Sequence, residues 1–153
     1  MSGAKDRRAG EFGRLVKTTK AQGSLLEAMR EVTQGALEAV KKNDTDRLEE
    51  ALSQREKLMR QVEAIQKRER ELRSKAGERL PPEFRTELET AEDHIIAELR
   101  RTIELNIELE QELHELKQRL DSERDQVNKL RQTAEGYRPK ELPSEGLFVD
   151  WKR

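Results

Sequence analysis

Along most of the chain, apolar residues recur every three or four positions, which is the spacing of one face of a helix. The first such pattern predicts a helix that begins between Glu11 and Ser24 and ends near Lys42. Two stretches contain neither Gly nor Pro, residues 36–76 and 83–135. Such stretches favour long helices over the short strands of a sandwich or barrel. We therefore expect an all-α protein.

Local signals predict where the second and third helices begin and end. The turn at residues 43–46 offers Asp44 or Thr45 as the N-cap of the second helix. Gly77 and the two prolines that follow it soon after end that helix near residue 76. The third helix then covers residues 83–134, about 78 Å at roughly 1.5 Å per residue.

The third helix carries an apolar seam whose positions alternate in steps of four and three, the repeat of a coiled coil. A second apolar stripe lies beside its first half and consists of Ile96, Ile103 and Ile107. Residues 88–109 are therefore predicted to contact two helices, and residues 109–134 to suit a single partner helix. The seam, with four polar interruptions, is Leu88, Glu92, Ile95, Leu99, Thr102, Asn106, Leu109, Leu113, Leu116, Leu120, Glu123, Val127, Leu130 and Ala134.

These helices predict an elongated antiparallel bundle or coiled coil. The first two form a helical hairpin, and the long third helix packs along it. Because the hairpin helices are shorter, roughly twenty residues near 114–134 have no intramolecular partner. Each large apolar side chain left there forgoes roughly 1.5–3 kcal/mol of burial free energy. We therefore expect this part of the seam to dimerise or to bind another protein's helix.

The two ends of the chain are predicted to differ from the three-helix body at residues 21–134. Residues 1–24 carry six basic and two acidic side chains, and three of the eight glycines of the chain lie between residues 10 and 23. Each glycine costs a helix about 1 kcal/mol relative to alanine. We therefore expect residues 1–20 to form a basic, frayed arm.

Residues 135–153 are predicted to form an irregular, extended tail, because prolines and a glycine exclude a continuous helix. The tail nevertheless contains Tyr137, Phe148 and Trp151. Aromatic side chains in such a segment serve as binding anchors. They can equally fold back and cap the end of the bundle, and the sequence leaves both interpretations open.

Composition narrows the class of protein. Of the 153 residues, 41% are charged and 33% hydrophobic, so the apolar residues suffice for narrow helical stripes and not for a thick core. The chain has no cysteine, which excludes disulfides and thiol chemistry. No apolar run reaches the roughly 18 residues of a membrane span, and the amino terminus lacks a secretory signal. We expect a cytoplasmic protein without membrane insertion.

The sequence contains no recognisable catalytic, cofactor or metal motif. Its two histidines, His94 and His114, belong to no zinc-binding or di-iron pattern. Glu110 lies one turn before His114, but such a pair arises by chance in a helix this rich in glutamate. We expect no enzyme activity and no cofactor.

A basic cluster at residues 66–79 is the sequence feature closest to a nucleic-acid site. Three glutamates are interleaved with its six basic residues, and no aromatic residue is present for stacking. A solvated face with internal ion pairs explains the cluster better. Nucleic-acid binding is therefore the weakest of the functional alternatives.

Two segments resemble the small flagellar type III export chaperones that serve hook–filament junction and filament-cap proteins. Residues 46–59, DRLEEALSQREKLM, are similar to the family's L-x-x-x-L-x-x-R-E-x-L-[MI] run. The tail from Tyr137 to Leu147-Phe148-Val149-Asp150-Trp151-Lys152-Arg153 is similar to its Tyr…Phe-Ile-Asp-Lys-Lys ending, with Trp151 where Lys is more usual. The resemblance covers about residues 20–153.

The resemblance implies a cytoplasmic chaperone for bacterial flagellum biogenesis. Such a protein binds the amphipathic carboxyl-terminal segment of a hook-associated type of subunit, blocks premature assembly and delivers the subunit to an export-gate protein. By position, Tyr137 is the expected gate contact, and Arg55 and Glu56 belong to the family signature with a structural role. We expect client contact at Leu109, Leu113, Leu116, Leu120, Val127 and Leu130. The alternative is a homodimeric structural or regulatory coiled coil.

Overall fold

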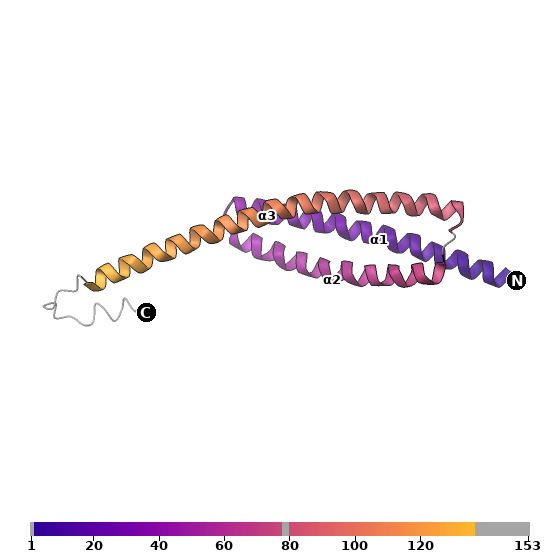
Figure 1. Ribbon diagram of the computed structural model, residues 1–153, viewed down its shortest axis with the longest axis horizontal. Helices are drawn as coiled ribbons and strands as arrows, with labels where there is room; N and C mark the ends of the chain where they lie inside the picture. The colour runs from indigo at the N-terminus through magenta and orange to yellow at the C-terminus, as the bar shows by residue number, and fades with distance from the viewer. Residues whose placement is uncertain (1, 78–79, 137–153) are drawn as a thin grey trace. The chain divides into compact units, whose positions relative to one another are not determined.

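The computed structural model describes residues 2–77 and 80–136, which form three helices and no strand (Figure 1). They are α1 (Ser2–Lys41), α2 (Thr45–Ala76) and α3 (Pro82–Gly136). The prediction of an all-α helical bundle is confirmed. None of these helices contains a segment both long enough and apolar enough to cross a membrane. The chain divides into two compact units, Met1–His114 and Glu115–Arg153, which are described in turn.

In the first unit, α1 and α2 form the predicted antiparallel hairpin. Of the two candidate caps, Asp44 is the one used, and its carboxylate accepts a hydrogen bond from the backbone N–H of Arg47 at 3.2 Å. Asn43 adopts a left-handed backbone conformation with φ of 55°, which asparagine tolerates better than most residues. The cap and the turn together reverse the chain within three residues.

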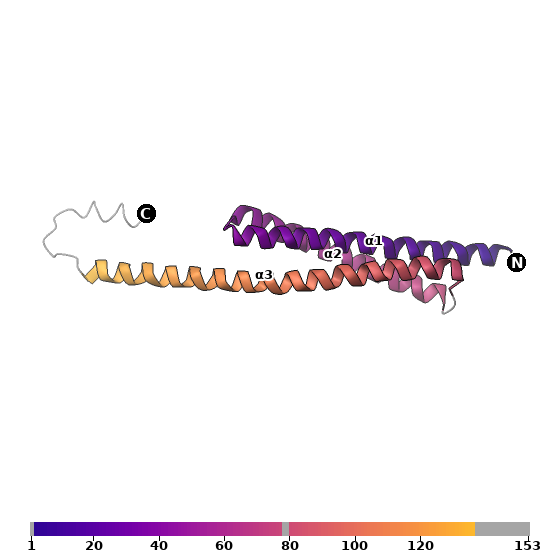
Figure 2. The same ribbon diagram turned by 90° about the horizontal axis from the view of Figure 1, so that it is seen from above.

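Within this unit, α3 runs parallel to α1 and antiparallel to α2, as both views of the ribbon show (Figures 1 and 2). Ion pairs join Lys20 to Glu87 at 3.6 Å, Arg30 to Glu98 at 2.5 Å and Lys41 to Glu108 at 4.0 Å. The offset between partners along the chain is nearly constant, as parallel helices require. These three pairs therefore share one register of α3 against α1.

The core of the first unit is built from all three helices. Near the start of α3, Phe12 and Phe84 lie with ring centroids 5.7 Å apart. One buried cluster consists of Leu15, Val16, Leu72 and Leu88, with Ala76, Leu80 and Phe84 packed against it. A second consists of Leu26, Met29 and Val62, with Leu25, Leu58 and Ile95 packed against it.

The predicted start of the first helix, between Glu11 and Ser24, is wrong, because α1 begins at Ser2. Phe12, Leu15 and Val16 are buried in the bundle. Burying three such side chains stabilises the helix by roughly 1.5–3 kcal/mol each. This gain exceeds the cost of about 1 kcal/mol for each nearby glycine. The bundle therefore includes residues well before position 21.

Polar residues that interrupt the apolar seams meet one another between helices. Arg55 donates a hydrogen bond to Asn106 Oδ1 at 2.5 Å. Arg73 bridges Glu69 of its own helix and Glu92 of α3, and hydrogen bonding to Glu92 raises the pKa of Arg73 above its ordinary value. The interruptions are therefore matched pairs rather than gaps in the packing.

Two glycines of α1 provide a matched stability test. Gly35 has no atom near the position that a Cβ would occupy, whereas a Cβ on Gly23 would lie 2.8 Å from His94 Nδ1. We expect Gly35→Ala to raise the free energy of unfolding by about 1 kcal/mol, because alanine is the better helix former. Gly23→Ala should gain less, since the His94 ring must move. Urea unfolding followed by circular dichroism measures both, and equal gains would contradict the close approach of His94.

Candidate functional site

The second unit carries four large apolar side chains of the predicted seam, Leu116, Leu120, Val127 and Leu130, which we call the terminal seam. Leu120, Val127 and Leu130 are 55%, 48% and 70% exposed, and Leu116 is partly buried. Every described residue after Leu116 is exposed. The described chain therefore leaves most of this apolar surface in contact with solvent.

Two of the predicted client-binding residues belong to the first unit and are less accessible. Leu113 is partly buried, and Leu109 is only 1% exposed. A side chain this buried has no surface to offer a partner, so the assignment of Leu109 to client contact is corrected to a core position. The heptad pattern could not separate the two roles, because core and partner-binding leucines share the same spacing.

Charges beside the terminal seam are segregated by heptad position. With Leu120 and Val127 at a and Leu116 and Leu130 at d, every e position is basic. Those e residues are Lys117, Arg124 and Arg131, and Arg119 adds a fourth basic residue at g. The acidic residues occupy outer positions, except Glu123, which lies in the seam at d. The apolar surface thus has basic margins.

A second exposed apolar stripe lies in the first unit, on α3, and consists of Ile96, Ile103 and Ile107. These side chains are 47%, 56% and 52% exposed. The sequence predicted that they would widen the face of α3 so that it contacts two helices. α3 does contact both α1 and α2, through Glu98 and Asn106, but the three isoleucines take no part in the buried core. That expectation is corrected.

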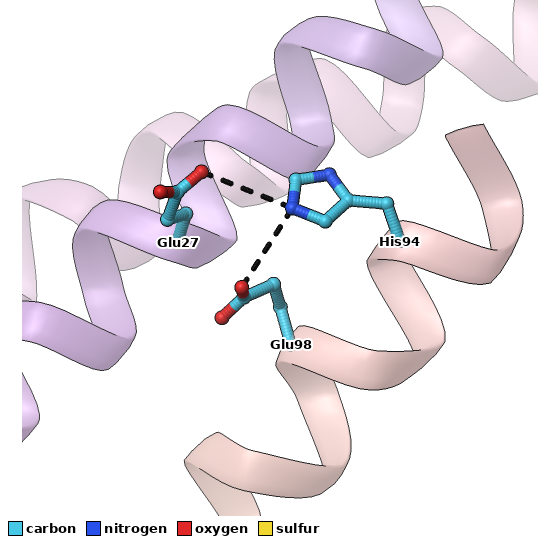
Figure 3. Close-up of side chains that lie close together, drawn as sticks. All are labelled: Glu27, His94 and Glu98. Atoms are coloured by element: carbon cyan, nitrogen blue, oxygen red, sulfur yellow. Dashed lines mark ion pairs between the residues drawn. The ribbon is translucent and has the colours of Figure 1, made fainter. Parts of the chain in front are cut away.

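The only cluster of metal-ligating groups among residues 2–77 and 80–136 joins Glu27 on α1 to His94 and Glu98 on α3 (Figure 3). His94 Nε2 lies 3.8 Å from a carboxylate oxygen of Glu27 and 3.7 Å from one of Glu98. The other Glu98 oxygen accepts a hydrogen bond from Arg30 at 2.5 Å, which raises the pKa of Arg30. Glu98 is therefore already engaged by Arg30 in an ion pair across the α1–α3 interface.

The remaining sequence-predicted sites are located less fully. His114 and Glu110, the pair weighed as a possible metal site, are exposed. Tyr137, the expected gate contact, and the tail anchors Phe148 and Trp151 lie outside the described residues. The described part of the basic cluster at 66–79 lies on or just after α2, and it is mostly exposed.

Comparison with known proteins supplies no assignment, since no protein-family model, curated protein or solved structure matches the chain. The family resemblance at residues 46–59 therefore stays a hypothesis from sequence. The geometry of the terminal seam is the observation on which a functional proposal depends.

Proposed function

We propose that this protein is a cytoplasmic export chaperone that holds an amphipathic helix of a client protein on the terminal seam. The observation that carries the proposal is the exposure of Leu120, Val127 and Leu130 in one heptad-spaced row. A row of this kind fits the apolar face of a single partner helix.

The energetics favour an occupied seam. Each of the exposed leucine and valine side chains gains roughly 1.5–3 kcal/mol when a partner buries it fully. The same side chains would promote nonspecific association if no partner covered them. Binding of a helix along Leu116–Leu130 therefore shields the apolar segments of both proteins from water until the client is released.

The resemblance to flagellar chaperones supports the identity of the client. We propose that it is the carboxyl-terminal amphipathic segment of a hook-associated type of flagellar subunit. In this proposal the bound segment cannot assemble prematurely, and the complex is delivered to an export-gate protein. Tyr137 is the proposed gate contact, and Phe148 and Trp151 are proposed anchors.

Hydrogen exchange on the full chain tests this function. A synthetic peptide with the sequence of the last forty or so residues of a hook–filament junction protein is added. This peptide is long enough to contain more than one helix. We expect slower exchange at residues 116–131 and a fluorescence-anisotropy titration that saturates. Sedimentation equilibrium of the free protein should show a monomer or weak dimer.

A matched pair of substitutions locates the binding surface. We expect Leu130→Asp to weaken peptide binding by about tenfold or more, which is the loss of one buried leucine expressed as affinity. Ile103→Asp, which alters a similarly exposed apolar residue of the same helix, should leave binding unchanged. Equal losses, or a tight dimer that persists with peptide, would contradict the chaperone proposal and favour a structural coiled coil.

A further inference from the structure

We infer that the occupant of the terminal seam is an amphipathic helix with acidic residues beside its apolar stripe and one basic residue within it. The inference rests on the proposed function, because it states the chemistry of the helix that the seam binds. Three observations carry it: the basic margins of the terminal seam, the lack of a partner for Glu123 among the described residues, and the like charges that two copies of the seam would bring together.

The basic margins select an acidic partner. Lys117, Arg124 and Arg131 flank the seam on one side and Arg119 on the other, and no flanking position between 117 and 133 is acidic. Within residues 2–77 and 80–136, these four side chains form no ion pair or side-chain hydrogen bond. In a two-helix coiled coil, flanking residues face those of the partner and determine which helices pair. Acidic residues at the partner's flanking positions would therefore be attracted.

Glu123 adds a second requirement, because it is a charged residue at a seam position. The polar interruptions at corresponding positions of the first unit are each satisfied. Glu92 pairs with Arg73, Asn106 accepts from Arg55, and the Thr102 hydroxyl donates to the Glu98 carbonyl at 2.7 Å.

Glu123 has no such counterpart among the described residues. A carboxylate that a partner helix covers must be paired, because burying an unpaired charge is costly. A lysine or arginine in the partner's apolar stripe would supply the missing pair.

A second copy of the chain fits the seam poorly in either orientation. In an antiparallel pair, e positions face e positions, so Lys117, Arg124 and Arg131 would meet the same basic row. In a parallel pair, Arg119 at g would face Arg124 at e of the next heptad, and Glu123 would face its own copy. Like charges at these positions disfavour association. A partner of opposite margin charge avoids all of these conflicts.

Designed peptides test the inference on the full-length protein. Two 28-residue helices, about four heptads each, carry identical Leu and Ile at a and d. One has Glu at every e and g position, and the other has Lys there. By fluorescence anisotropy at about 50 mM salt, we expect the Glu peptide to bind about tenfold more tightly or better. The difference should shrink at about 500 mM salt, where screening is strong.

Charge reversal on the protein provides the control. Lys117→Glu/Arg124→Glu/Arg131→Glu should reverse the preference between the two peptides. Arg100→Glu/Arg101→Glu/Lys129→Glu makes the same change in net charge away from the margins and should keep the original preference. A shared response of both triple variants would overturn the inference, because it would assign the selectivity to net charge alone.

The seam charge is tested with a third peptide, which has one Lys in place of the apolar residue opposite Glu123. The wild-type protein should bind this peptide more tightly than the otherwise identical peptide that keeps the apolar residue. The Glu123→Leu variant should bind the apolar peptide more tightly. Equal binding of the Glu and Lys peptides at both salt concentrations overturns the inference while leaving the proposed function intact. If no helical peptide binds, the proposed function fails first.

Discussion

Leu109→Ala is expected to lower the free energy of unfolding by about 3 kcal/mol. The same substitution at Leu130 should change it by less than about 0.5 kcal/mol. Both leucines belong to one heptad row of α3, but Leu109 is 1% exposed and Leu130 is 70% exposed. Truncating Leu109 removes buried apolar surface and leaves a cavity, whereas truncating Leu130 removes surface that already contacts water. Urea unfolding monitored by circular dichroism compares the two variants directly.

The peptide titration gives the opposite order for the same two variants. Leu130→Ala should weaken binding of a helical peptide, and Leu109→Ala should leave the affinity of the folded fraction unchanged. This crossed pattern separates a core leucine from a partner-binding leucine of identical chemistry and spacing. Comparable destabilisation by both substitutions would show that Leu130 is covered within the free protein, and the proposed function would lose its main support.

Most helix boundaries could be predicted because local chemistry determines them. Asp44 caps α2, and the prolines after Gly77 end it, so α2 (Thr45–Ala76) and the start of α3 at Pro82 agree with the sequence. The start of α1 could not be found in this way. Its glycines oppose helix locally, and only burial against α2 and α3 outweighs them. That burial depends on contacts between residues far apart in the chain.

The candidate site could be predicted only in part, for a related reason. Heptad spacing identified the apolar row of α3, and Leu120, Val127 and Leu130 of that row are exposed in the described chain. Spacing did not reveal that Asn106 meets Arg55 and that Glu92 meets Arg73. Those pairs depend on the register between helices, which no single helix encodes. Only when these matched pairs are known does Glu123 stand out as a charged seam residue with no comparable partner among the described residues.

The second large effect is expected at the ion pair between Arg30 and Glu98. Their side chains are 21% and 14% exposed, and the guanidinium donates to the carboxylate at 2.5 Å. Arg30→Met should lower the free energy of unfolding by about 2 kcal/mol, because it leaves a largely buried carboxylate without its charged hydrogen-bond donor. Lys20→Met is the matched control. The pair it breaks, Lys20–Glu87, is 60% and 59% exposed, and water already solvates both charges, so the change should stay below about 0.5 kcal/mol.

A double variant shows whether the loss comes from the pair itself or from the carboxylate left behind. Arg30→Met/Glu98→Met replaces both charges with apolar side chains, and buried ion pairs replaced in this way often lose little stability. We therefore expect the double variant to recover most of the loss seen in Arg30→Met. Additive losses in the double-mutant cycle would contradict this account, because independent contributions imply that Arg30 and Glu98 do not interact. Recovery would establish that the α1–α3 interface tolerates an apolar pair but not a lone charge.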